Sequence, residues 1–150
     1  MKSTNQLVKE HIVAAYGAAS NPNYSFVAKV FNKQPYKEVM TGLSTHFIIE
    51  DITEINYDVS FSYVLKKQNE YLLQLSMIAK FFVLFELATG RKMTQVVNEA
   101  SDSDEEYIFL FLEKNGFIRI DETIMASSTD LVDVESGSKL NVYQALFTTS

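Results

Sequence analysis

Two neighbouring segments with the alternating polarity of β-strands constrain the fold of this chain more than any other feature of its sequence. Across 55–65 apolar and polar residues alternate with a period of two, which is typical of a strand with one buried and one wet face. Across 71–87 the odd positions are apolar, and the five residues between the two segments are polar. Five residues suit a hairpin loop, so the pattern predicts a long antiparallel hairpin, about 55–65 and 71–87.

The opposite face of the second segment departs from this alternation. Ile78, Phe82 and Leu84 are apolar at positions where polar residues are expected. Either helices of the protein cover both faces of the sheet, or an apolar patch is exposed to a partner subunit or a client protein. Coverage by the protein's own helices is the commoner arrangement.

The N-terminal residues have the pattern of an amphipathic helix. Apolar residues recur three and four positions apart across 4–19, and Ser3 or Thr4 is a suitable N-cap. The polar segment that follows contains Pro22, which disfavours a helical conformation in the residue before it. The sequence therefore predicts a helix that ends before this proline.

A second helix is predicted over about 104–115. Ser103 and Glu106 have the spacing of a capping box, acidic residues crowd the first turn, and Gly116 lies where a C-terminal cap belongs. Because 107–112 is a continuous apolar run, a strand stays open as the alternative for that part.

Shorter patterns complete the fold prediction. Strands are expected at 26–31, 46–50, 117–120 and 140–147, a short helix after Pro35, and turns at 127–130 and 135–138. No internal repeat and no long linker divides the 150 residues. The sequence therefore predicts a single domain, 1–150, of the α+β class, with helices packed against an antiparallel sheet.

Residue types that the chain lacks disfavour several functional classes. There is no cysteine, which removes disulfides, a thiolate nucleophile and thiolate metal ligands. The two histidines, His11 and His46, are not joined by the spacing of a metal site, and glycine motifs for phosphate binding do not occur. We expect no metal, no cofactor and no catalytic residue.

No segment has the pattern of a membrane span or a secretory signal. The most apolar segment, 71–88, carries Lys80 at its middle, where a charge costs roughly 2.5 to 3.5 kcal/mol on an insertion scale. Residues 1–6 lack the apolar run of a signal peptide. We expect a cytoplasmic protein that does not bind membranes.

Negative charge is concentrated in the last third of the chain. The net charge is -6, and residues 101–150 hold ten acidic and three basic side chains. This balance disfavours binding to nucleic acid phosphates and favours a basic protein partner. Two groups of acidic residues are the candidate partner-binding residues: Asp102, Asp104, Glu105 and Glu106 at the start of the second predicted helix, and Asp130, Asp133 and Glu135 near the two turns.

In general character the chain resembles the bacterial immunity proteins of contact-dependent and other polymorphic toxin systems. It shares with them small size, acidity, the absence of cysteine and a single predicted domain. The resemblance implies a non-catalytic protein that binds and neutralises a cognate basic toxin domain, for example a nuclease. The seven acidic residues are assigned to partner binding on the basis of their charge alone.

Two other functions stay open. The segment 55–87 is similar in outline to the long hairpin of the SecB export chaperones, in which an aromatic-rich strand follows an alternating one, as 80–85 does here. That resemblance implies self-association and binding of many unfolded clients, although 121–150 departs from the family where a docking helix belongs. A small enzyme that depends on acidic residues is the third reading, because nineteen acids always offer carboxylate pairs.

Overall fold

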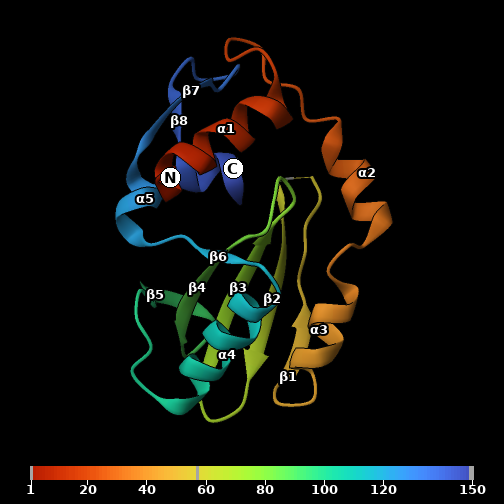
Figure 1. Cartoon of the computed structure of the whole chain (residues 1–150), viewed down its shortest axis with the longest axis vertical. Helices are drawn as coiled ribbons and strands as arrows, with labels where there is room; N and C mark the ends of the chain where they lie inside the picture. The colour runs from red at the N-terminus through yellow and green to blue at the C-terminus, as the bar shows by residue number, and fades with distance from the viewer. Residues whose placement is uncertain (1, 57, 149–150) are drawn as a thin grey trace.

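The computed structural model describes residues 2–56 and 58–148, and its centre is a six-stranded sheet (Figure 1). Five strands lie in the order β1-β2-β3-β4-β5 with antiparallel neighbours, and β6 runs parallel to β4. A separate ribbon is formed by β7 and β8. The combination of helices with this sheet confirms the α+β class. The strands are β1 (Ile48–Asp51), β2 (Ser60–Lys66), β3 (Glu70–Ser76), β4 (Phe81–Ala88), β5 (Lys92–Val96), β6 (Ile118–Arg119), β7 (Ser128–Val132) and β8 (Lys139–Asn141).

Three helices precede the sheet, and the first is the predicted N-terminal helix. It begins with a capping box, in which Ser3 and Gln6 each accept a hydrogen bond from the other's backbone N–H. The predicted strand at 26–31 is wrong, because this segment lies in a helix. Val27 and Phe31 are four residues apart, so a short apolar run suits a helix face as well as a strand. The helices are α1 (Thr4–Tyr16), α2 (Phe26–Lys33), α3 (Lys37–Leu43), α4 (Ser103–Lys114), α5 (Glu122–Ala126) and α6 (Val142–Leu146).

The predicted hairpin forms around its loop but is shorter than expected. β2 pairs with β3 in antiparallel register, with Phe61 opposite Leu75. The first segment becomes a regular strand only at Ser60, and of its earlier residues Tyr57 lies outside the described part of the chain. The single long strand predicted at 71–87 is wrong, because the chain reverses direction between β3 and β4.

This reversal, at 77–80, contains neither glycine nor proline, the residues that usually mark a turn. The Ile78 N–H donates to Ser76 Oγ at 3.2 Å, and the Phe81 N–H donates to the Ala79 carbonyl at 2.8 Å. Apolar residues continue on both sides of the turn because β3 and β4 are both buried strands. The alternating pattern therefore passes through the turn without a break.

Helix α4 covers the sheet face that carries Phe82 and Leu84, whereas Ile78 packs against the core on the other side, which contains Phe81 and Val83. Phe82 and Leu84 are fully buried and Ile78 is half-buried. The ring centroid of Phe82 lies 5.8 Å from that of Phe109 on α4. Coverage by the protein's own helices is confirmed, and these side chains form no exposed patch.

The face of β2 that was predicted to be solvent-exposed is buried as well. Ser60 and Ser62 are both buried, and the Ser60 hydroxyl donates to the Phe147 carbonyl at 2.8 Å. The same carbonyl accepts the Val59 N–H at 3.0 Å, so the end of the chain docks against the start of β2. The core on this side joins the sheet to α1, α5 and α6, and its members include Val8, Ile12, Tyr16, Phe81, Val83, Phe85, Met125 and Leu146.

The C-terminal third contains one confirmed helix and one wrong strand. The segment 107–112 is helical within α4, which confirms the predicted helix there. The predicted strand at 140–147 ends at Asn141, because Asn141 and Gln144 form the capping box that begins α6. The turn predicted at 127–130 is wrong in most of its length, since β7 begins at Ser128.

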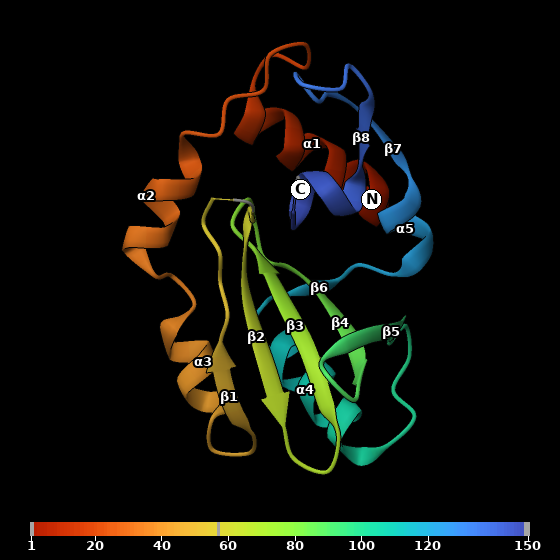
Figure 2. The same cartoon turned by 180° about the vertical axis from the view of Figure 1, so that it is seen from behind.

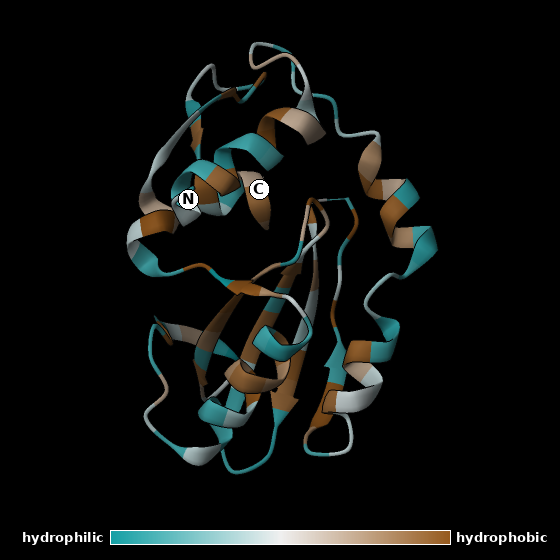
Figure 3. Ribbon diagram, viewed as in Figure 1, coloured by the Kyte–Doolittle hydropathy of each residue, from teal (hydrophilic) through white to brown (hydrophobic). Residues whose placement is uncertain are grey.

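The two ends of the molecule are formed by different elements. Figures 1 and 2 show α1, α6 and the β7–β8 ribbon at one end, with the β2–β3 loop and the start of α4 at the other. Apolar residues concentrate along the central strands (Figure 3). Among the described helices, none combines the length and the apolar character needed to cross a bilayer.

Candidate functional site

The four acidic residues at the start of α4 are engaged mainly within the protein. Asp102 is the N-cap, and its Oδ1 accepts the Glu105 N–H at 2.9 Å. Asp104 lies 3.5 Å from the ammonium group of Lys67 in the β2–β3 loop. Glu106 is exposed. This group therefore offers a partner less free charge than its sequence suggests.

Glu105 is buried, with only 4% of its surface exposed. One carboxylate oxygen accepts the Tyr71 hydroxyl at 2.8 Å, and the other accepts the N–H and the hydroxyl of Ser101 at 2.9 and 3.0 Å. Burial, and then the bond to Glu105, raise the pKa of the Tyr71 hydroxyl. Glu105 joins α4 to the sheet, and its burial leaves no surface for direct contact with a partner.

The three acidic residues of the β7–β8 ribbon face different surroundings. Asp130 lies beside α1 and 3.8 Å from the Lys139 ammonium group. Asp133 is held in the turn, where its carboxylate accepts the Glu135 N–H at 3.1 Å and the Ser136 hydroxyl at 3.0 Å. Asp133 and Glu135 share a cleft that Asp130 does not line.

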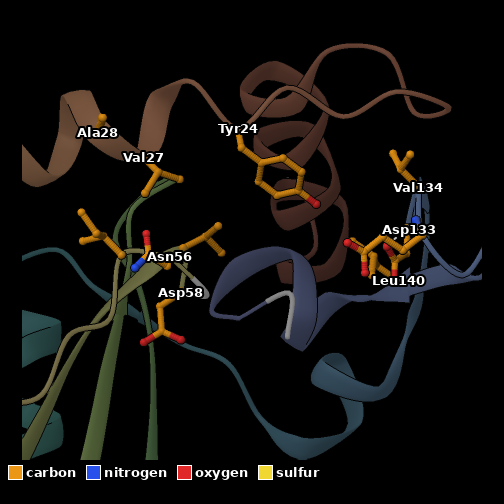
Figure 4. Close-up of a pocket in the computed structure, with 11 residues that line it drawn as sticks. Tyr24, Val27, Ala28, Asn56, Asp58, Asp133, Val134 and Leu140 are labelled. Carbon is orange, nitrogen blue, oxygen red and sulfur yellow. Dashed lines mark hydrogen bonds between the residues drawn. The ribbon is translucent and has the colours of Figure 1, made fainter.

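This cleft, of about 640 Å³, is formed by α2, the segment before β2 and the β7–β8 ribbon (Figure 4). We call it the acidic cleft. Three of its lining residues are carboxylates, and none of the lining residues described is lysine, arginine or histidine. The cleft is lined by Tyr24, Val27, Ala28, Ile55, Asn56, Asp58, Val59, Asp133, Val134, Glu135 and Leu140.

Exposed apolar side chains gather at the same cleft. Tyr24, Ile55 and Val134 are 37%, 43% and 70% exposed, and all three line it. An exposed large apolar side chain is unremarkable alone, but several of them together around a hollow are typical of an interaction surface. The acidic cleft thus combines negative charge with apolar contact area.

Asp58 lies opposite the turn and beside Asn56 (Figure 4). Burial raises the pKa of its carboxyl group, although hydrogen bonds from the Glu54 backbone and the Thr148 and Ser62 side chains act in the other direction. Sequence reasoning missed Asp58 because it occurs singly in an alternating segment. No pattern in the sequence connects it to Tyr24 or to the turn.

A chain of polar side chains continues from this region into the sheet. Ser62 Oγ accepts the Gln74 amide at 3.5 Å, and Gln74 Oε1 accepts the Tyr143 hydroxyl at 2.9 Å. Gln74 is buried, so its amide needs these partners. Asp58 is therefore supported by a fixed polar network below the acidic cleft.

Asp58→Asn should raise the free energy of unfolding at pH 7. The folded-state pKa of Asp58 lies above its ordinary value of 3.8, so the native state binds the proton more tightly than the unfolded chain. Stability should fall as pH rises from about that value through the folded pKa, and the asparagine removes this loss. Urea unfolding between pH 3.5 and 7.5 measures it. Asp130→Asn, which removes an exposed charge, should change stability by about 0.5 kcal/mol or less.

The described residues contain no converging group of three or more histidine, aspartate or glutamate side chains that could hold a metal ion. Comparison with models of known protein families, with curated proteins and with solved structures found no significant match to this chain.

Proposed function

We propose that this protein is a non-catalytic binding protein that neutralises a basic protein partner, and that the acidic cleft is its contact surface. The observation that carries the proposal is the meeting of three carboxylates and three exposed apolar side chains around one cleft, with no basic side chain among the lining residues that the structure describes. In type this is an immunity protein whose partner is a toxin domain, and its place of action is the cytoplasm.

Electrostatics supports this choice of partner. Asp58, Asp133 and Glu135 come from two segments far apart in the sequence, and no described lining residue offsets their charge. Charges of one sign that line a hollow raise the local potential and speed the approach of oppositely charged partners. A basic toxin domain would be attracted and oriented by this field.

Apolar contact supports a protein rather than a small ion as the partner. Stable protein interfaces have an apolar centre that is richer in aromatic residues than the remaining surface. Tyr24, Ile55 and Val134 supply such a centre beside the carboxylates. The chaperone alternative gains no support from Phe82 and Leu84, because both are buried and offer no exposed surface to a client.

Affinity co-purification of the tagged protein from its native host, with a 0.5 M salt wash, tests the proposal. We expect one basic protein at one-to-one stoichiometry, because that salt concentration screens exposed ion pairs but leaves an apolar centre intact. Many unfolded clients would favour a chaperone, and a single acidic or neutral partner would contradict the proposal.

A pair of matched variants then locates the contact. Asp133→Asn with Glu135→Gln removes two charges from the acidic cleft and keeps the acceptor that holds the turn. Glu106→Gln with Glu113→Gln removes two charges from exposed positions of α4. The cleft variant should associate with the partner about tenfold more slowly in 50 mM salt, with a weaker salt dependence, and the α4 variant should behave as the wild type. Equal rates for both variants would exclude the cleft as the contact.

A further inference from the structure

One wall of the acidic cleft is an aromatic ring that is fixed in place. The Tyr24 ring packs edge-on against Tyr16, with a centroid separation of 5.2 Å and an interplanar angle of 81°. Tyr16 is fully buried, and its hydroxyl donates to the Ala145 carbonyl at 2.6 Å. Tyr24 therefore presents its exposed part to the cleft from a rigid support.

The facing wall is a carboxylate that is also held in place. Asp133 accepts two hydrogen bonds within the β7–β8 turn, and the Gly137 N–H donates to its carbonyl at 2.7 Å. Figure 4 shows the hydroxyl end of Tyr24 pointing across the cleft toward Asp133. Glu135, which lines the cleft beside Asp133, is exposed.

An aromatic ring and two carboxylates that line the same cleft suit one side chain better than any other. The guanidinium group of arginine is planar, stacks on aromatic rings and forms two parallel hydrogen bonds with a carboxylate. The ammonium group of lysine is a compact, strongly hydrated charge that neither stacks nor binds in a bidentate way. The methylene groups of arginine can lie on apolar surface, which Val134 and Ile55 provide in the lining of the cleft.

We propose that the acidic cleft binds an arginine side chain of the basic partner, with the guanidinium group paired with the Asp133 and Glu135 carboxylates and packed against the Tyr24 ring. This inference rests on the proposed function and names the chemical group that the cleft selects. Arginine is the charged residue most enriched among the energetically dominant positions of protein interfaces. Asp58, on the other side of the cleft, adds negative charge that disfavours an acidic side chain in the same place.

Titration of the ¹⁵N-labelled protein with N-acetyl-arginine methylamide and N-acetyl-lysine methylamide tests this inference without the natural partner. We expect the arginine probe to bind about fivefold more tightly, with amide shifts at Tyr24, Val134 and Glu135, because stacking on an aromatic ring adds to the charge interaction. Tyr24→Leu should abolish the preference for arginine, and Tyr24→Phe should retain it. Asp133→Asn with Glu135→Gln should weaken both probes.

Equal binding of the two probes, shifts confined to α4, or no shift with either probe would overturn the arginine inference. These outcomes leave the co-purification experiment unaffected, since a partner bound to the cleft through other side chains would still associate more slowly with the charge-neutralised variant. A different outcome would contradict the proposed function itself: a captured partner that binds the cleft variant and the wild type equally.

Discussion

Replacing Glu105 with alanine should lower the free energy of unfolding by about 3 kcal/mol. The carboxylate is 4% exposed and accepts hydrogen bonds from Tyr71 and Ser101, so the substitution removes three bonds at once. It also leaves the Tyr71 hydroxyl at a buried site without this acceptor, and an unpaired buried donor costs more than the bond itself contributed.

Chemical denaturation of Glu105→Ala and Glu106→Ala measures this effect with a neighbouring control. Both substitutions remove an acidic side chain from the first turn of α4, but Glu106 is exposed. Glu106→Ala should lower the free energy of unfolding by about 0.5 kcal/mol or less, since it removes only a weak interaction with the helix dipole. Similar losses for the two variants would show that the hydrogen bonds of Glu105 do not stabilise the fold.

Phe82→Ala should destabilise the fold at least as much as Glu105→Ala, with an expected loss of about 3 to 5 kcal/mol in the free energy of unfolding. Phe82 is fully buried on β4, a central strand, and its ring packs against Phe109 of α4. Truncation removes the apolar contact between the sheet and the helix and leaves a cavity that this packed interior cannot fill.

Leu110→Ala is the matched control on α4, because Leu110 is 59% exposed. Leu110→Ala should lower the free energy of unfolding by less than about 1 kcal/mol. Thermal and urea unfolding of both variants give the comparison. If Phe82→Ala cost no more than Leu110→Ala, then α4 would cover the sheet only loosely, and a client-binding face on β4 would again be a reasonable reading.

The sequence predicted the helices and strands that carry local signals. Ser3 caps α1 as predicted, and α4 begins at the predicted place, although its N-cap is Asp102 and not Ser103; capping involves residues within one turn of the chain. The reversal at 77–80 and the helix at 26–31 were missed, because each segment is apolar apart from one lysine and its local pattern suits more than one conformation.

Only part of the candidate site was accessible to sequence reasoning. Asp133 and Glu135 were found through charge, whereas Tyr24, Ile55 and Asp58 come from segments that only the tertiary fold brings to the same cleft. Glu105 was predicted to contact a partner, but the structure buries it. Its burial depends on Tyr71, thirty-four positions earlier in the chain, and a local count of charges does not detect such a partner.

Hydrogen exchange of the complex between this protein and the captured partner would test the central claim most directly. Protection upon binding should appear in 24–28, 58–59 and 133–140, the segments that carry the acidic cleft, and the exposed face of α4 should exchange as in the free protein. Protection confined to 102–106, with exchange in the cleft segments unchanged, would contradict the claim that the acidic cleft is the contact surface. It would place the contact at the start of α4 instead.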